Sequence, residues 1–160
     1  MNRHAFIRSA LAAAVVFGIA GCSQMGQMGQ GGQGSSTAAP SNVVVYTATL
    51  ASAEEVPPAT DSQGRGTAEV SVDTSTNELT WKVSYSGLTG PATMGHIHGP
   101  AGKGQNAGVI VPFPGVANAT SAEGKAKLDQ AQYGDLAAGL YYVNIHTAKH
   151  PGGEIRGQLE

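Results

Sequence analysis

Four of the chain's five histidines fall in two short segments, and imidazole is the side chain that most often binds metals in proteins. The first segment contains His96 and His98, separated by one residue and followed by Gly-Pro. On a strand, residues two apart point to the same face with Cα atoms about 7 Å apart, so both imidazoles can reach one ion. On a helix they would point in nearly opposite directions. The second segment contains His146 and His150.

The C-terminal segment, residues 139–158, is predicted to form the hairpin that carries His146. Residues 140–147 are rich in β-branched and aromatic side chains, residues 149–153 are turn formers, and residues 154–159 extend again. The two-residue period of a strand predicts a polar face and an apolar face, namely Tyr142, Asn144 and His146 against Tyr141, Val143 and Ile145. We expect the chemistry of the protein where this hairpin approaches the His96 segment.

Separated histidines that converge predict a copper or zinc site, since nitrogen ligands suit both metals. His96, His98 and His146 are the candidate ligands, and His150 is a candidate fourth. The pattern resembles the copper half-site of copper-zinc superoxide dismutase. However, residues 99–107 contain no histidine or aspartate for a zinc loop, so we do not predict dismutase activity.

Two other interpretations remain open for the same residues. In the first, the histidines and Asn144 hydrogen-bond loop backbones and fix the hairpin, with Glu154 and Arg156 forming a salt bridge in the same network. In the second, the histidines form a pH-responsive or ligand-binding surface. Glu54 and Glu55 are adjacent, so they cannot act as a paired acid and base, and we expect them in a solvated loop. No Gly-x-Ser-x-Gly nucleophile motif is present, and no catalytic residue is predicted.

The remaining pattern predicts an all-β domain over residues 43–160. Alternating or β-branched segments predict strands at 43–50, 67–73, 78–86, 108–111 and 123–128, besides the His96 segment and the final hairpin. We expect Trp81 to anchor the core. Residues 129–138 are the one place for a short helix, ended by Gly139. Short strands with frequent turns favour an antiparallel two-sheet β-sandwich with the final strand pair lying centrally.

The first 42 residues predict export and anchoring. Residues 1–21 combine two arginines, an apolar run and a small-residue cleavage site directly before Cys22, a pattern resembling the bacterial lipobox. Cys22 is therefore predicted to be the lipidated N-terminus, and Ser23 favours the outer membrane by the sorting rule of enteric bacteria. Residues 22–42 are predicted to be a flexible Gly/Gln/Ser-rich tether. Its Met25 and Met28 are interpreted as ordinary linker residues rather than copper ligands.

The formal net charge of the sequence indicates which classes of partner are favoured. Two of the nine basic residues lie in the leader, which leaves seven against eleven acidic residues and a formal charge of −4. This balance and the absence of a basic patch disfavour nucleic-acid binding. The predicted membrane contact is the lipid anchor.

Four motifs, taken together and in order, resemble the CHRD domain, a family named after chordin. They lie at residues 50–66, 96–101, 142–147 and 151–158. The resemblance implies a β-sandwich of immunoglobulin-like or superoxide-dismutase-like character and no established activity. The cysteine-rich growth-factor-binding modules of chordin-like proteins are absent from this sequence.

Two functions are therefore predicted. One is a non-enzymatic binding or structural module of the cell envelope that contacts another envelope protein or a polymer. The other is a copper- or zinc-binding envelope protein for metal handling or redox protection.

Overall fold

The computed structural model describes residues 42–160, and the predicted leader, Cys22 and the tether up to residue 41 lie outside the described residues. The described residues form eight strands, one short 3₁₀ turn and one α-helix. Their bounds are β1 Val43–Ala51, η1 Ser52–Glu54, β2 Arg65–Asp73, β3 Glu78–Ser86, β4 Ala92–His98, β5 Val109–Pro112, β6 Ser121–Lys127, α1 Gln130–Ala137, β7 Tyr142–Thr147 and β8 Ile155–Gln158. The predicted all-β class is confirmed.

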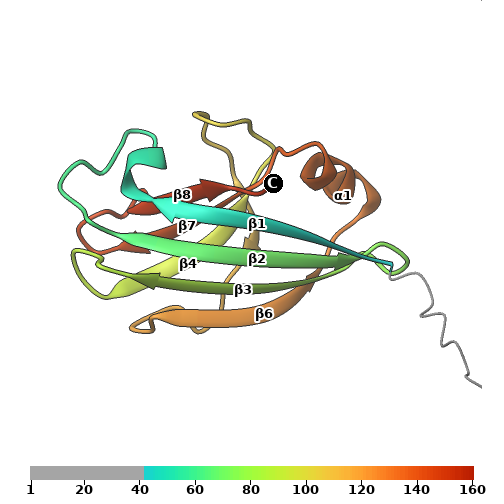
Figure 1. The fold of residues 1–160 in the computed structure, drawn as a ribbon, viewed down its shortest axis with the longest axis horizontal. Coiled ribbons are helices and arrows are strands. Elements are labelled where there is room, and N and C mark those ends of the chain that lie inside the picture. The colour runs from blue at the N-terminus through green and yellow to red at the C-terminus, as the bar shows by residue number, and fades with distance from the viewer. Residues whose placement is uncertain (1–41) are drawn as a thin grey trace, which may run out of the picture. The chain divides into compact units, whose positions relative to one another are not determined.

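All neighbouring strands pair antiparallel in one sheet with the order β5-β4-β7-β8-β1-β2-β3-β6. A division into two separate sheets is not confirmed, because β1 joins the halves. β1 pairs with β2 along its length and with β8 at Ala51 and Arg156. Beyond β8, Thr47 and Glu160 exchange backbone hydrogen bonds of 2.9 and 3.0 Å. The sheet curls until it is nearly closed, so that β4 and β7 pass behind β1, β2 and β3 (Figure 1).

The core lies inside this curled sheet. Trp81 on β3 is 2% exposed, as predicted for a core anchor, and stacks on Phe113 with ring centroids 3.8 Å apart. Glycine is required at position 124 on β6, since a Cβ there would lie 2.6 Å from the Trp81 ring. Tyr85 donates a 3.0 Å hydrogen bond to the Val116 carbonyl. The segment after β5 therefore packs against the opposite half of the sheet and closes the core.

The predicted short helix is confirmed as α1. Asp129 caps its N-terminus by accepting a hydrogen bond from the Gln132 amide, and the Gln132 side chain accepts one from the Asp129 amide in return. Gly139 follows the helix with a φ of +72°, a conformation that glycine adopts without strain. Leu136 is fully buried in the core. Within residues 42–160, no helix has the length and apolar character needed to cross a membrane.

The final hairpin lies centrally, as predicted, and every residue of β7 is buried. Val143 and Ile145 belong to the core. The opposite, polar face is covered by two loops, residues 52–64 and 99–108, that contact each other through a 2.9 Å hydrogen bond from Asn106 to the Val56 carbonyl. We call this the covered face.

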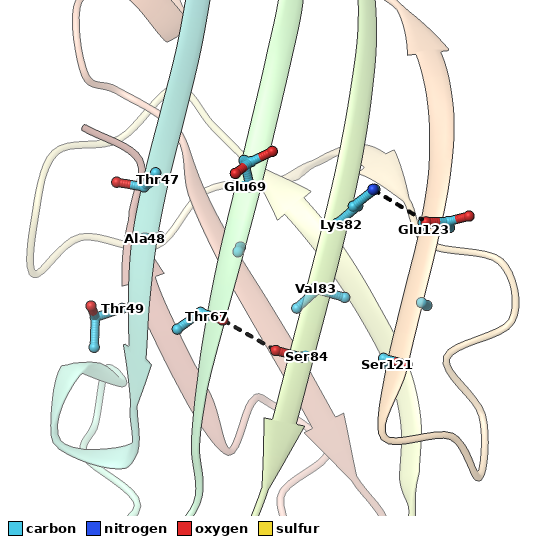
Figure 2. Close-up of a pocket in the computed structure, with 12 residues that line it drawn as sticks. Thr47, Ala48, Thr49, Thr67, Glu69, Lys82, Val83, Ser84, Ser121 and Glu123 are labelled. Atoms are coloured by element: carbon cyan, nitrogen blue, oxygen red, sulfur yellow. Dashed lines mark hydrogen bonds and ion pairs between the residues drawn. The ribbon is translucent and has the colours of Figure 1, made fainter.

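The outer face of the other half is formed by β1, β2, β3 and β6, and no loop of residues 42–160 covers it. Figure 2 shows its side chains along the four strands. They line a shallow hollow of about 760 Å³. Its polar side chains are exposed and make surface contacts such as the 3.1 Å one between the Thr67 and Ser84 hydroxyls. Lys82 and Glu123 lie 3.9 Å apart across it. We call this the open face.

Candidate metal centre

Three of the predicted histidines meet on the covered face. In the pairing of β4 with β7, His96 lies opposite Asn144, His98 opposite Tyr142, and Met94 opposite His146. One ring nitrogen from each of His96, His98 and His146 lies within 4.8 Å of the other two. The His96 ring centroid is 5.3 Å from that of His98 and 4.9 Å from that of His146. We call these residues the histidine triad.

Backbone carbonyls orient two of the three rings. His98 Nδ1 lies 3.0 Å from the Ala107 carbonyl oxygen, and His146 Nδ1 lies 3.0 Å from that of Pro151. A carbonyl can only accept, so each Nδ1 carries the proton and each Nε2 keeps a free lone pair. Metal-binding histidines use the same arrangement, in which a hydrogen bond to the remote nitrogen sets the tautomer and the ring orientation.

The lone pair on Nε2 of His98 is unsatisfied. In the part of the chain that the structure describes, His98 Nε2 is buried and has no hydrogen-bond partner. A buried polar atom without a partner costs about 1–3 kcal/mol, so such atoms are rare and call for an explanation. An ion bound among the triad would satisfy this nitrogen.

His96 completes the triad through direct contact with His146. His96 Nδ1 lies 3.1 Å from His146 Nε2. Because the Pro151 carbonyl holds the His146 proton on Nδ1, His96 must donate in this contact. Two nitrogens on a tetrahedral zinc ion are each about 2.0–2.1 Å from the metal and hence roughly 3.4 Å apart. A shift of the His96 proton from Nδ1 to Nε2, with small side-chain rotations, would therefore convert the metal-free cluster into a ligand set.

Burial keeps all three imidazoles neutral. It lowers the pKa of His96 to about 4, with further contributions from His146 and His98. The pKa of His98 is lowered by burial and by the charge of Arg156, against the opposing effect of the Ala107 carbonyl. The pKa of His146 is also lowered, mainly by burial. At neutral pH the triad is therefore in the deprotonated form that binds metals.

His150 does not join the triad. The turn between β7 and β8 carries it toward the loop before β2, where its Nε2 lies 3.2 Å from Asp61 Oδ1. Lys149 contacts the same carboxylate at 2.6 Å. The prediction that His150 supplies a fourth ligand is not supported by this placement, because the turn conformation and not strand alternation directs the side chain.

Asn144 lies on the covered face beside the triad, as predicted, but it bonds a carboxylate and not a loop backbone. Its amide nitrogen donates to both oxygens of Glu55 at 3.0 and 3.1 Å. The expectation of a solvated loop is wrong for Glu55, which is only 4% exposed. Burial raises the pKa of Glu55 to about 7, although the charge of Arg156 acts in the opposite direction. Glu54, by contrast, lies 3.1 Å from the surface residue Lys103.

The predicted salt bridge between Glu154 and Arg156 is absent among residues 42–160. Arg156 instead donates to Asn106 Oδ1 at 3.0 Å and to the Gln105 carbonyl at 2.6 Å, and its guanidinium lies 3.5 Å from the centroid of the Tyr142 ring. Since β8 begins only at Ile155, strand alternation does not extend back to Glu154. Arg156 thus holds the 99–108 loop over the covered face.

Glu154 has its own partners. Its carboxylate accepts hydrogen bonds from the Ser62 and Thr147 hydroxyls, both at 2.6 Å. It also accepts from the Thr89 amide at 2.6 Å and hydroxyl at 2.9 Å. Burial alone would raise the pKa of Glu154, but these hydrogen bonds lower it below the ordinary value. Glu154 therefore ties two separate segments, those of Ser62 and Thr89, to the end of the final hairpin and bonds Thr147 within the hairpin itself.

Sequence reasoning missed two residues near the triad. Glu55 gave no signal, because its burial depends on a loop that folds over β7. Met94 did give one, since it precedes His96 by two residues and would share its face on a strand that begins earlier than His96. The structure begins β4 at Ala92.

These observations define a small all-β antiparallel domain with three neutral imidazoles gathered on one face of its sheet. The family model described as the CHRD domain matches residues 46–159, and the chain belongs to this family. Neither a curated protein nor a solved structure matches the chain.

Proposed function

We propose that this chain is a non-enzymatic envelope module whose folded domain binds one copper or zinc ion through His96, His98 and His146. The observation that carries the proposal is the buried, unpartnered Nε2 of His98 beside two further imidazole nitrogens. A purely structural role accounts for the two Nδ1 contacts with backbone carbonyls. It does not account for the buried Nε2 of His98, which has no hydrogen-bond partner among residues 42–160.

The rest of the proposal depends on the sequence. The leader pattern and Cys22 support an exported lipoprotein, anchored in the cell envelope and by preference in the outer membrane. Membership of the CHRD family supports a non-enzymatic module. An anchored domain with a metal site suits metal handling or redox protection at the membrane, together with an envelope protein or polymer as partner.

Metal binding by the full chain, purified in detergent without a polyhistidine tag, tests the proposal. Calorimetry with Cu(II) and Zn(II), together with metal analysis by mass spectrometry, should give one ion per chain. Loss of an outer-shell partner alone costs about 10–100-fold in metal affinity, so His98→Ala should lose more than about 100-fold.

His150→Ala is the matched control, since it removes an imidazole near the same hairpin but outside the triad. It should keep the affinity of the unaltered chain, and circular dichroism should show that both variants are folded. Absence of stoichiometric metal, or equal losses in the two variants, would contradict the proposal.

A further inference from the structure

Met94 lies on the covered face next to the triad. The pairing of β4 with β7 has a bulge between Ala92 and Met94, which leaves Thr93 as the extra residue. Without this bulge the residue opposite His146 would be Thr93. The bulge shifts the alternation by one residue, and from Met94 onward it is in phase with His96 and His98. Bulges commonly redirect a side chain in this way near functional sites.

The side chain of Met94 is free to reach an ion. It lies directly opposite His146, and facing residues of an antiparallel pair have Cβ atoms about 4.5–5.5 Å apart. It is 47% exposed, and it is one of the few large apolar side chains that residues 42–160 leave exposed. Core packing therefore does not explain it. Its three rotatable bonds and polarizable sulfur suit it to adapt to a neighbouring ligand.

We infer that Met94 supplies a thioether ligand to the ion held by the histidine triad and that the site selects copper(I). The inference rests on the proposed function. Thioether sulfur is a soft ligand that selects copper(I), whereas zinc sites use thiolate, imidazole and carboxylate ligands. An added methionine therefore favours copper(I) over zinc.

The charges around the triad favour the same ion. All four ligands are neutral, and the nearby buried carboxylate of Glu55 is engaged by Asn144. The buried guanidinium of Arg156 lies 3.5 Å from the centroid of the Tyr142 ring, which stacks on His98 with ring centroids 5.0 Å apart, so its positive charge also acts on a bound cation. Burying a charge without an anionic partner is costly, and the cost rises with the charge. A singly charged ion is therefore favoured over a doubly charged one.

The test compares copper(I) and zinc affinities in Met94→Leu, a substitution that conserves volume and apolar character. Copper(I) is titrated anaerobically against a colorimetric chelator, and Zn(II) by calorimetry, using the full chain. The variant should lose about tenfold or more in copper(I) affinity and keep its zinc affinity within about twofold. X-ray absorption of the copper(I) form should show a sulfur neighbour that the variant lacks.

The double variant Met25→Leu plus Met28→Leu is the matched control, because it removes two thioethers from the predicted tether. It should leave the copper(I) affinity and the sulfur signal unchanged. If the triad binds metal but Met94→Leu leaves the ratio of copper(I) to zinc affinity unaltered, the inference about Met94 is wrong and the proposed function stands. If no metal binds, both are wrong.

Discussion

The two outer faces of this sheet follow the same strand alternation but differ in their exposure to water. On the open face, threonine, serine and paired charges such as Lys82 and Glu123 extend into water (Figure 2). On the covered face, two loops bury His98 and His146 together with an asparagine, a glutamate and an arginine, and His96 is half-buried. Polar groups in water need no further partners, whereas buried ones must be paired or they reduce stability.

The covered face holds a buried polar arrangement that packing alone does not require. The covered face keeps a carboxylate whose pKa is raised to about 7 and an imidazole whose pKa is lowered to about 4. It also keeps orphan atoms at His98 Nε2 and Asn144 Oδ1 within the described chain. Perturbed titratable groups gathered in this way are typical of functional sites.

The largest loss of stability is expected at Glu154, which ties loops to the end of the final hairpin. Glu154→Ala removes the acceptor of four hydrogen bonds and leaves the hydroxyl donors of Ser62 and Thr147 buried without a partner, whereas the exposed Thr89 can turn to water. Each unsatisfied buried donor costs about 1–3 kcal/mol, so the free energy of unfolding should fall by roughly 3–5 kcal/mol. Urea unfolding of the full chain measures this loss.

Glu154→Gln is the graded control for this experiment. It retains one oxygen acceptor, so its loss should be smaller than that of the alanine variant. A loss below about 1 kcal/mol in Glu154→Ala would show that water reaches these donors, and the distinction between the covered and open faces would then fail at this end of the sheet.

A smaller, pH-dependent effect is expected at Glu55. Its pKa is raised from 4.5 to about 7 in the folded chain, so the folded state holds the proton more tightly than the unfolded state does. The stability from this group is therefore complete below about pH 4.5 and is lost as the pH rises through 7. Glu55→Gln should remove that loss, gaining on the order of 2 kcal/mol at pH 8 relative to its effect at pH 4.5.

Urea unfolding across this pH range provides the measurement, and Glu54→Gln provides the control. Glu54 adjoins Glu55 in sequence but pairs with Lys103 at the surface, so its replacement should give no such trend. If Glu55→Gln is instead the less stable variant at pH 8, the ionised carboxylate is stabilised by Arg156, and burial is not the dominant effect at this site.

Strand alternation explains how much of this site was predictable. It placed Asn144 and His146 on one face and Val143 and Ile145 on the other, and the structure confirms both. Gly139, predicted to end the short helix, follows α1 with a positive φ and was an equally local signal. Each of these predictions depends only on neighbours within a few residues.

The features that could not be predicted depend on contacts between distant segments. Two adjacent glutamates indicate a surface loop, and only the folding of residues 52–64 over β7 buries Glu55. The turn conformation at Gly153, with a φ of +135°, precedes β8 and helps to set where His150 and Glu154 point. The single sheet depends on the pairing of Ala51 with Arg156 and of Thr47 with Glu160, which no local pattern encodes.

The smallest effect is expected on the open face. Thr67 is exposed and its hydroxyl contacts Ser84 at 3.1 Å, but water can replace that hydrogen bond. Thr67→Val keeps the β-branched shape, so the free energy of unfolding should change by less than about 0.5 kcal/mol, and metal affinity should not change. Urea unfolding and calorimetry check both. A loss comparable to that of Glu154→Ala would mean that the open face is also a stabilising network. In that case both faces would stabilise the fold in the same way, and the difference between them would not support a binding role for the buried polar groups.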